Sequence, residues 1–259
     1  MNILDTIVER KREEILERKQ KQPLSGLGSM EFYRRITNGV RVPAPEGRPG
    51  IIAEFKRMSP SRGPMHMEAD PVVVATAYEM AGVSAMSILT DLSFFGGTLS
   101  DLHQVRRACP QLALLRKDFI IDPYQLHEAS AHGADMVLLI AAVLDRTEVE
   151  ELALEATSLG LQVLFEVHAG EELDKYHPAI RYVGVNNRNL KTLRVDTQTS
   201  LDLIADLPSE VVPVSESGLS QPEEVRSLWN AGYRLFLMGE HFMKEKDPGT
   251  ACLNFINQV

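Results

Sequence analysis

The stretch EFKRMSPSRG, residues 54–63, places a carboxylate and an amine on one side of an extended segment. The apolar residues before it predict the start of a buried strand. Because alternate side chains of a strand share a face, Ile52, Glu54 and Lys56 are expected to point the same way. Burying unpaired charge is costly, so a core strand that ends in two ionisable groups indicates a site for chemistry.

Polar groups follow several other apolar stretches in the same manner. LLRKDF contains Lys117 and LFEVH contains Glu166, while GVNNRN and VSESGLS contain Asn186 and Glu216. Lysines among carboxylates suit acid/base chemistry, because the carboxylates keep a lysine charged while desolvation lowers its pKa. Ion-pair networks also gather charge, so the joint position of these groups is a stronger signal than any one of them.

The last two polar segments also predict an anion site. SESGLS and LMGE place Gly218 and Gly239 where backbone N–H groups can face a phosphate, and Ser59 and Ser61 add hydroxyl donors. The alternative is that the two glycines only make tight turns. We favour phosphate because both loops carry the pattern.

Apolar residues occupy the same zones as these polar groups. Together they are expected to form a slot for a flat aromatic ring, and they are Phe94, Phe95, Phe119, Leu138 and Leu190. His168 is a candidate base. No metal-ligand spacing surrounds it, so we expect neither a metal nor a cofactor.

These groups depend on an alternation of strands and helices that runs from Ile51 to the C-terminus. The expected strands are Ile51–Lys56, Ala85–Thr90, Ala113–Lys117, Met136–Ile140, Gln162–Val167, Tyr182–Asn186, Val211–Ser215 and Leu235–Met238. The expected helices include Val72–Ala81, Leu99–Ala108, Pro123–His132, Thr147–Leu159 and Pro222–Ala231. Eight such units predict an α/β fold, a closed (β/α)8 TIM barrel, whose chemistry collects at the carboxyl ends of the strands. A doubly wound sheet is the alternative, but no GxGxxG follows the first strand.

The N-terminal segment, residues 1–50, is expected to be a helical extension packed on the barrel, so that residues 1–259 form a single domain. Apolar residues recur at helical spacing from Ile3 to Leu16, between Lys, Arg and Glu. The pattern fades after Leu16, which disfavours a coiled coil. Whether this helix caps the barrel or contacts a substrate stays open.

Composition limits the class of protein. The chain has 259 residues, 44% hydrophobic and 24% charged, with a net charge of −9. This charge argues against a nucleic-acid or anionic-membrane surface, and we expect neither partner. Two distant cysteines predict reduced thiols, and no signal-peptide or membrane-spanning pattern is present. We therefore expect a cytoplasmic protein and a monomer, with a weak homo-oligomer as the alternative.

The chain resembles the indole-3-glycerol-phosphate synthase family of tryptophan biosynthesis. The matching stretches are IIAEFKRMSPSRG, LTDLSFFGGTLSDL, LLRKDFIIDPYQLHEASAHGADMVLLIAA, LFEVH, VGVNNRNL, VSESGLS and LMGEHFM, in family order. The resemblance implies a carboxy-lyase that needs no cofactor. Its substrate is expected to be 1-(2-carboxyphenylamino)-1-deoxyribulose 5-phosphate, which closes to an indole with loss of carbon dioxide and water.

The resemblance also implies a role for each matching residue. Lys117 is expected to protonate the ketone oxygen during ring closure. Glu166 and Lys56 are expected to share the dehydration as acid and base, in an order left open. The supporting catalytic groups are Glu54, Asn186, Glu216 and Ser217. Arg188 is expected to hold the substrate carboxylate. The expected phosphate ligands are Ser59, Ser217, Gly218, Gly239 and Glu240, the last three mainly through backbone N–H groups. The expected ring contacts are Phe95, Phe119, Leu138 and Leu190.

Two rival hypotheses stand beside this one. A sister barrel, such as a phosphoribosyl isomerase or a tryptophan synthase α-like lyase, would share the phosphate loops but would not need two strand-end lysines beside Glu166. A non-catalytic barrel that binds a phosphorylated ligand could keep the glycines and lose the acid/base groups, and here that set is complete.

Overall fold

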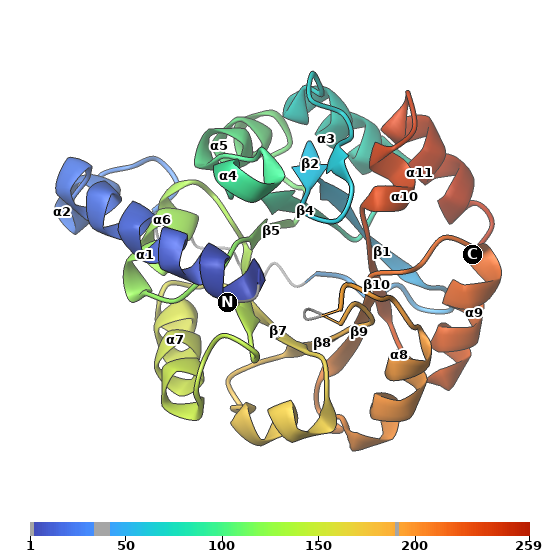
Figure 1. Cartoon of the computed structure of the whole chain (residues 1–259). Helices are drawn as coiled ribbons and strands as arrows, with labels where there is room; N and C mark the ends of the chain where they lie inside the picture. The colour runs from blue at the N-terminus through green and yellow to red at the C-terminus, as the bar shows by residue number, and fades with distance from the viewer. Residues whose placement is uncertain (1–2, 34–41, 190–191) are drawn as a thin grey trace.

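A computed structural model of the chain describes residues 3–33, 42–189 and 192–259. Its centre is a closed barrel of parallel strands in the order β1-β10-β9-β8-β7-β6-β5-β4 (Figure 1). The strands are β1 (Gly50–Phe55), β4 (Ala85–Leu89), β5 (Leu114–Lys117), β6 (Met136–Ile140), β7 (Gln162–Val167), β8 (Tyr182–Asn186), β9 (Val212–Glu216) and β10 (Leu235–Met238). All eight strands expected from the sequence are present, four with the expected bounds and four with ends that differ by one residue, and the predicted TIM barrel is confirmed.

Helices surround the barrel and link successive strands. Those predicted from the sequence are α3 (Pro71–Ala81), α5 (Leu99–Ala108), α6 (Pro123–Ala131), α7 (Arg146–Ser158) and α9 (Pro222–Ala231). The sequence did not predict the short elements, which are α2 (Leu24–Leu27), α4 (Leu92–Phe95), η1 (Gly170–Lys175), α8 (Gln198–Leu203), η2 (Ile204–Asp206), α10 (Glu240–Met243), α11 (Pro248–Ile256) and an antiparallel hairpin of β2 (Met58–Ser59) with β3 (Gly63–Pro64). Most of these have one or two turns, too few for an apolar period to show.

The strands separate two apolar layers. Ile52, Leu138 and Leu237 belong to the cluster inside the barrel. Ile51 and Phe55 belong to the outer cluster, which the helices cover. Burial on both faces explains why the strands are continuous apolar runs, as expected of parallel strands. The first strand therefore has the predicted alternation, with Ile52 and Glu54 on its inner face.

Local signals start and end the helices. Asp145 caps α7 by accepting a hydrogen bond from the backbone of Glu148, whose carboxylate accepts one from the Asp145 N–H at 2.8 Å. Gly82 ends α3 with φ of 80°, in the left-handed region that glycine enters at least cost.

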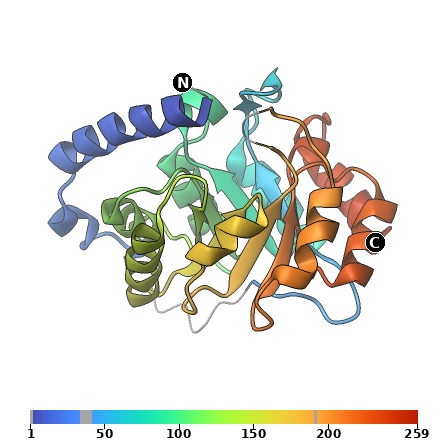
Figure 2. The same ribbon diagram turned by 60° about the horizontal axis from the view of Figure 1, so that its bottom comes forward.

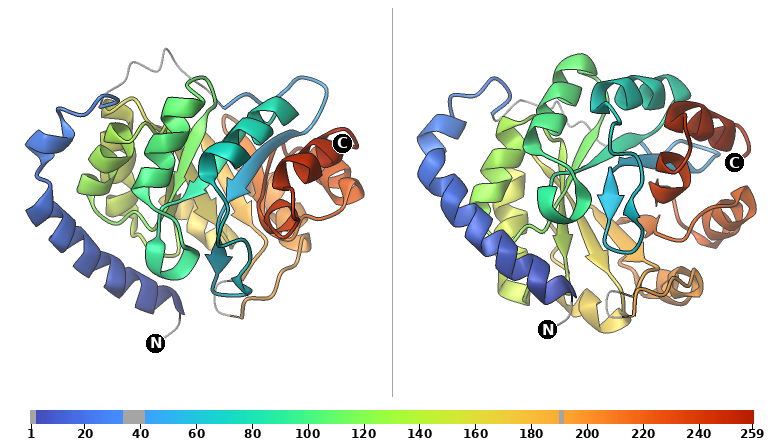
Figure 3. Two further views of the ribbon diagram at one scale, coloured as in Figure 1. Left: turned by 90° about the horizontal axis from the view of Figure 1, so that it is seen from above. Right: turned by 45° about the horizontal axis from the view of Figure 1, so that its top comes forward.

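The N-terminal helix α1 (Ile3–Lys21) lies beside α6, with its first turn at the same end of the barrel as the β2–β3 hairpin (Figures 2 and 3). Ile7 and Ile15 are buried as its pattern predicted, but Leu16 is 62% exposed. Lys11 is buried instead, because its ammonium reaches Asp91 at 2.7 Å and Asp118 at 2.9 Å. An apolar pattern cannot show a lysine whose ion partners come from distant loops.

A buried chain of ion pairs continues from Lys11 into the barrel wall. Asp118 also accepts from Arg116 at 2.9 Å, and Arg116 reaches Glu128 at 3.2 Å. Arg18, one turn from the end of α1, closes the chain with Glu128 at 3.1 Å. Burial lowers the pKa of Lys11, but the two aspartates outweigh it and raise that pKa overall. These pairs bind α1 to the loops after β4 and β5 and to α6.

Candidate active site

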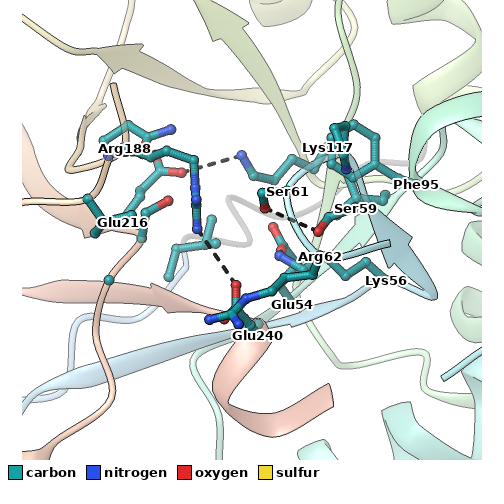
Figure 4. A pocket seen from close by; sticks show the side chains of 18 of the residues that line it. Glu54, Lys56, Ser59, Ser61, Arg62, Phe95, Lys117, Arg188, Glu216 and Glu240 are labelled. Carbon is teal, nitrogen blue, oxygen red and sulfur yellow. Dashed lines mark hydrogen bonds and ion pairs between the residues drawn. The ribbon is translucent and has the colours of Figure 1, made fainter. Parts of the chain in front are cut away.

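A cavity of about 890 Å³ opens at the carboxyl ends of the barrel strands (Figure 4). Every described residue to which the family resemblance gave a role lines it: Glu54, Lys56, Ser59, Phe95, Lys117, Phe119, Leu138, Glu166, Asn186, Arg188, Glu216, Ser217, Gly218, Gly239 and Glu240. Leu190 lies outside the described residues. Parallel strands of similar length end at one rim, which explains how residues so far apart in sequence come to share one cavity.

Lys117 lies between two carboxylates at the centre of this cavity. Its Nζ is 3.3 Å from Oε2 of Glu166 and 3.5 Å from Oε2 of Glu216. The three residues come from β5, β7 and β9. A fourth polar group, the amide of Asn186, lies at the same level of the barrel, because Asn186 on β8 is paired in register with Glu216 on β9. The barrel thus gathers a cation, two carboxylates and an amide at one level.

The cluster separates the pKa values of its carboxyl groups. Burial and the nearby carboxylate Glu166 raise the pKa of Glu216 to about 8, although Lys117 opposes the shift. Burial acts in the same direction on Glu166, but Lys117 and His168 outweigh it and the pKa of Glu166 falls well below its usual range. For Lys117, the carboxylates overcome the effect of burial and raise the pKa. The cluster therefore favours a charged lysine and an ionised Glu166, and it makes Glu216 the carboxyl group that binds a proton more readily.

His168 stands behind Glu166, on the same face of the chain two residues later. Its Nε2 is 3.3 Å from Oε1 of Glu166, and its Nδ1 is 3.5 Å from Oε2 of Glu172. Burial lowers the pKa of His168, yet the two glutamates raise it to about 10 overall. The sequence named His168 only as a candidate base. In the structure His168 does not line the cavity, and its contacts with two glutamates favour the charged imidazolium beside Glu166.

Glu54 and Lys56 form the pair that the first strand predicted. Lys56 donates to Oε1 of Glu54 at 2.6 Å, and the side chain of Glu54 is 5% exposed. Gly239 makes room for this carboxylate, because a Cβ at residue 239 would lie 2.6 Å from Oε1 of Glu54. In the same way, a Cβ at Gly184 would collide with the carboxylate of Glu216. Two glycines in the barrel wall therefore leave the space that two buried acids need.

The loops after β1, β9 and β10 form one end of the cavity. Ser217 has a left-handed φ of 67° and Gly218 follows with φ of 80°. Gly239 precedes α10, whose first N–H groups have no partner within the helix. The Oγ atoms of Ser59 and Ser61 lie 3.4 Å apart on the hairpin above. Hydroxyl and backbone donors thus meet where the sequence predicted an anion.

Two arginines and a glutamate cross the mouth of the cavity. The carboxylate of Glu240 forms an ion pair with the guanidinium of Arg62 at 2.8 Å and another with that of Arg188 at 3.7 Å (Figure 4). Arg62 belongs to the opening stretch of the sequence, but its side chain was not among the predicted site residues. A cation beside two loop serines was the signal that could have identified it.

An apolar wall completes the cavity. The rings of Phe95 and Phe119 lie 6.2 Å apart, and Leu138 lies below them in the barrel. Phe94 was expected in this wall but does not line the cavity. The first turn of α1 does, through Ile3, Leu4 and Ile7. The sequence left open whether this helix covers the core or reaches the site, and the structure shows that it does both.

Within the described part of the chain, no three His, Cys, Asp or Glu side chains are placed to share a metal ion. In residues 3–33, 42–189 and 192–259, no helix combines the length and apolar character needed to cross a bilayer.

Fold and site together define a TIM barrel with lysines and carboxylates gathered in one cavity, an arrangement suited to acid/base chemistry. The chain belongs to the indole-3-glycerol phosphate synthase family, whose sequence model matches residues 4–255. An indole-3-glycerol phosphate synthase of Bacteroides thetaiotaomicron is 44% identical over 100% of this chain and 99% of its own length. Another, from Verminephrobacter eiseniae, is 42% identical over 96% of this chain and 97% of its own length. Among the three hypotheses that the sequence raised, this membership favours the synthase.

Solved structures support the fold. The 3-hexulose-6-phosphate synthase of Salmonella typhimurium superposes with a TM-score of 0.64 and 14% identity, over 81% of this chain and 99% of its own. The thiamine phosphate pyrophosphorylase of Pyrococcus furiosus gives a TM-score of 0.60, also at 14% identity, over 81% of this chain and 94% of its own. At such identities the likeness concerns the barrel alone.

Proposed function

We propose that the protein converts 1-(2-carboxyphenylamino)-1-deoxyribulose 5-phosphate to indole-3-glycerol phosphate, carbon dioxide and water. The observation that carries the proposal is the position of Lys117. Its ammonium lies between Glu166 and Glu216, in a cavity that has an apolar wall on one side and anion donors on the other. The substrate has the matching parts, since it carries an aromatic ring, a ketone and a phosphate.

Ring closure is assigned to Lys117. As the ring carbon that bears the carboxylate attacks the ketone carbon, Lys117 gives a proton to the ketone oxygen, which becomes a hydroxyl. The C–CO2 bond then breaks, and its electron pair returns to the ring as carbon dioxide leaves. The raised pKa of Lys117 ensures that it is protonated when the substrate arrives. Its buried setting strengthens its attraction for developing negative charge.

Dehydration is assigned to Glu166 and Lys56. The lowered pKa of Glu166 keeps it ionised, which suits it to accept a proton from the closed ring system. Lys56 then protonates the departing hydroxyl, which leaves as water. Glu54 holds Lys56 by the 2.6 Å hydrogen bond. We assign Asn186 and Glu216 to the orientation of the hydroxyl and of Lys117.

The rest of the cavity is assigned to binding. Phe95, Phe119 and Leu138 flank the aromatic ring, and Arg188 holds its carboxylate. The phosphate is assigned to the loop end, with the proposed ligands Ser59, Ser217, Gly218, Gly239 and Glu240, the last three mainly through their backbone N–H groups. Leu190, which lies outside the described residues, is retained as a proposed ring contact. No metal or cofactor takes part in these steps.

The test is an assay of purified protein with this substrate and a chelator, followed by indole fluorescence and release of carbon dioxide. We expect equal amounts of both products. Lys117→Met should lower kcat by about 10²–10⁴-fold, the usual contribution of acid catalysis. Lys19→Met, on the outer end of α1, is the matched control and should keep normal turnover. Absence of product at saturating substrate would exclude the synthase, and near-normal turnover of Lys117→Met would remove Lys117 from its role.

We further propose that residues 1–259 act as one domain and that the protein is cytoplasmic. The ion pairs of Lys11 and Arg18 with the barrel support the first proposal. Limited proteolysis tests it, since a single domain should lose α1 only together with the rest of its structure.

Membership of a family that acts on a phosphorylated small molecule supports the proposal that the protein is cytoplasmic. Fractionation of the cells that make the protein tests it.

A further inference from the structure

Asn187 is a buried amide that the reaction steps above do not use. It follows Asn186 at the end of β8, is 2% exposed and is not among the residues that line the cavity. Its Nδ2 donates to Oγ of Ser215 at 3.1 Å and to the backbone oxygen of Ser217 at 3.0 Å. Its Oδ1 accepts from N and Oγ of Ser200 at 3.1 and 2.8 Å. Both hydrogens and both lone pairs of the amide are therefore used.

These contacts form a ring with one direction of donation. Oγ of Ser200 gives its proton to Asn187, so the 2.8 Å contact between the hydroxyls of Ser200 and Ser215 must be donated by Ser215. Ser215 in turn accepts from Nδ2 of Asn187. Each member donates to the next, which makes the bonds mutually reinforcing. The reverse orientation of the amide would place its oxygen against the oxygen of Ser217, so the network fixes Nδ2 toward the β9 loop.

The contact with Ser217 sets the direction of one peptide unit. In a trans peptide the C=O and N–H groups point in opposite directions. The oxygen of Ser217 points to Asn187, behind the cavity wall, so the N–H of Gly218 points to the cavity side. The structure records no backbone hydrogen bond from this N–H to another described residue. Ser217 is held in a left-handed conformation that is unfavourable for a residue with a side chain, which requires support from its surroundings.

We propose that Asn187 is a positioning residue for the phosphate of the substrate, which acts by fixing the Ser217–Gly218 peptide with its N–H toward the anion. The inference rests on the proposed function, because that function places a phosphate at this loop. Asn187 itself does not touch the substrate. Its effect is to remove the cost of ordering the loop when the anion binds.

Asn187→Asp tests the proposal with a side chain of the same shape. A carboxylate accepts at both oxygens, so it repels the oxygen of Ser217 and releases the peptide. We expect KM to rise about tenfold with kcat within about twofold, since the lost contact stabilises bound substrate and transition state alike. The thermal stabilisation given by inorganic phosphate should need a correspondingly higher phosphate concentration. Asn187→Ala, which adds no buried charge, should change both quantities in the same direction.

Tyr233→Phe is the matched control. It removes the 2.8 Å hydrogen bond from Tyr233 to the backbone oxygen of Ser200, at the far end of the same network. This variant should lower the melting temperature without changing KM or the response to phosphate. If both Asn187 variants match the wild type in KM and phosphate response, or if Tyr233→Phe changes these as they do, Asn187 has only a structural role. If the wild type is inactive but is still stabilised by phosphate, the proposed reaction is overturned. The phosphate response of the two Asn187 variants then decides this inference.

Discussion

At the scale of single residues, the site depends on small separations between buried charges. Lys117 lies within 3.5 Å of two carboxylates whose pKa values are shifted in opposite directions. A pair of acids separated in this way can hold one proton and accept another at the same pH. The positions of Glu54 and Glu216 depend in turn on glycines that face them, which makes those glycines part of the site.

Gly239→Ala is predicted to disturb catalysis through Glu54. Gly239 has φ of −132°, which any residue adopts, so the effect of a methyl group here is purely steric. The new Cβ would lie 2.6 Å from Oε1 and 2.8 Å from Cβ of Glu54, and the carboxylate that holds Lys56 must move. We expect kcat/KM to fall about 10²-fold, as small misplacements of catalytic groups do.

Gly26→Ala on α2 is the control for this substitution. The nearest atom to its new Cβ would lie 3.7 Å away, so activity should be unchanged. A fully active Gly239→Ala would show that Glu54 tolerates displacement and does not position Lys56.

His168→Gln is predicted to change the pH dependence of stability. The pKa of His168 is raised to about 10 in the folded protein, above its ordinary value of 6.5. The folded state therefore binds this proton more tightly, and the resulting stabilisation is complete below pH 6.5 and is lost as the pH rises through 10. The difference in free energy of unfolding between wild type and His168→Gln should shrink steadily over that interval.

Urea unfolding at pH 6, 8 and about 10 measures this difference. His177→Gln is the control, because its nearest carboxylate oxygen, on the exposed Glu150, is 4.0 Å away. A wild-type advantage that stays constant with pH would mean that His168 is uncharged in the folded protein.

At the scale of elements, α1 contributes to both stability and the cavity. Its inner face carries Ile7, Lys11 and Ile15, and its first turn lines the cavity. Because Lys11 contacts Asp91 and Asp118 just beyond β4 and β5, the helix is bound to the carboxyl ends of two strands that border the site.

Lys11→Met is predicted to loosen this helix. It leaves two buried aspartates without a shared cation, and breaking a buried ion pair costs about 3–5 kcal/mol. We expect a loss of that order in urea unfolding, together with a raised KM because Ile3, Leu4 and Ile7 are displaced. Urea unfolding and steady-state kinetics of the same purified variants measure the free energy of unfolding and KM.

Lys21→Met on the same helix is the matched control. Lys21 pairs with Glu17 at 3.5 Å, but the two side chains are 77% and 60% exposed. Such pairs contribute about 0–1 kcal/mol. Equal losses from the two variants would contradict the role given to Lys11.

At the scale of the whole molecule, the closed barrel leaves no open sheet edge for pairing with another chain. The net charge of −9 also opposes self-association. We therefore predict a monomer of 28.9 kDa in light scattering.

The most exposed apolar side chains on α3 are Met80 at 82% and Val73 at 67%. If a dimer of twice that mass forms, Met80→Glu should show whether α3 is its interface.

The sequence by itself determined the barrel and the residues of its mouth. Parallel strands buried on both faces must be apolar runs, and alternation within a strand puts Glu54 and Lys56 together. Polar residues directly after such runs are therefore visible as a set without any contact being known. Of the described residues predicted for the site, all but Phe94 and His168 line the cavity.

Only the tertiary structure decided how these groups act on one another. Lys117, Glu166 and Glu216 lie 49 and 50 residues apart along the chain, and no local pattern fixes their separation or the opposite shifts of their pKa values. The burial of Lys11 and the network of Asn187 could not be predicted for the same reason. Each depends on partners from distant parts of the chain, which become neighbours only when the barrel closes.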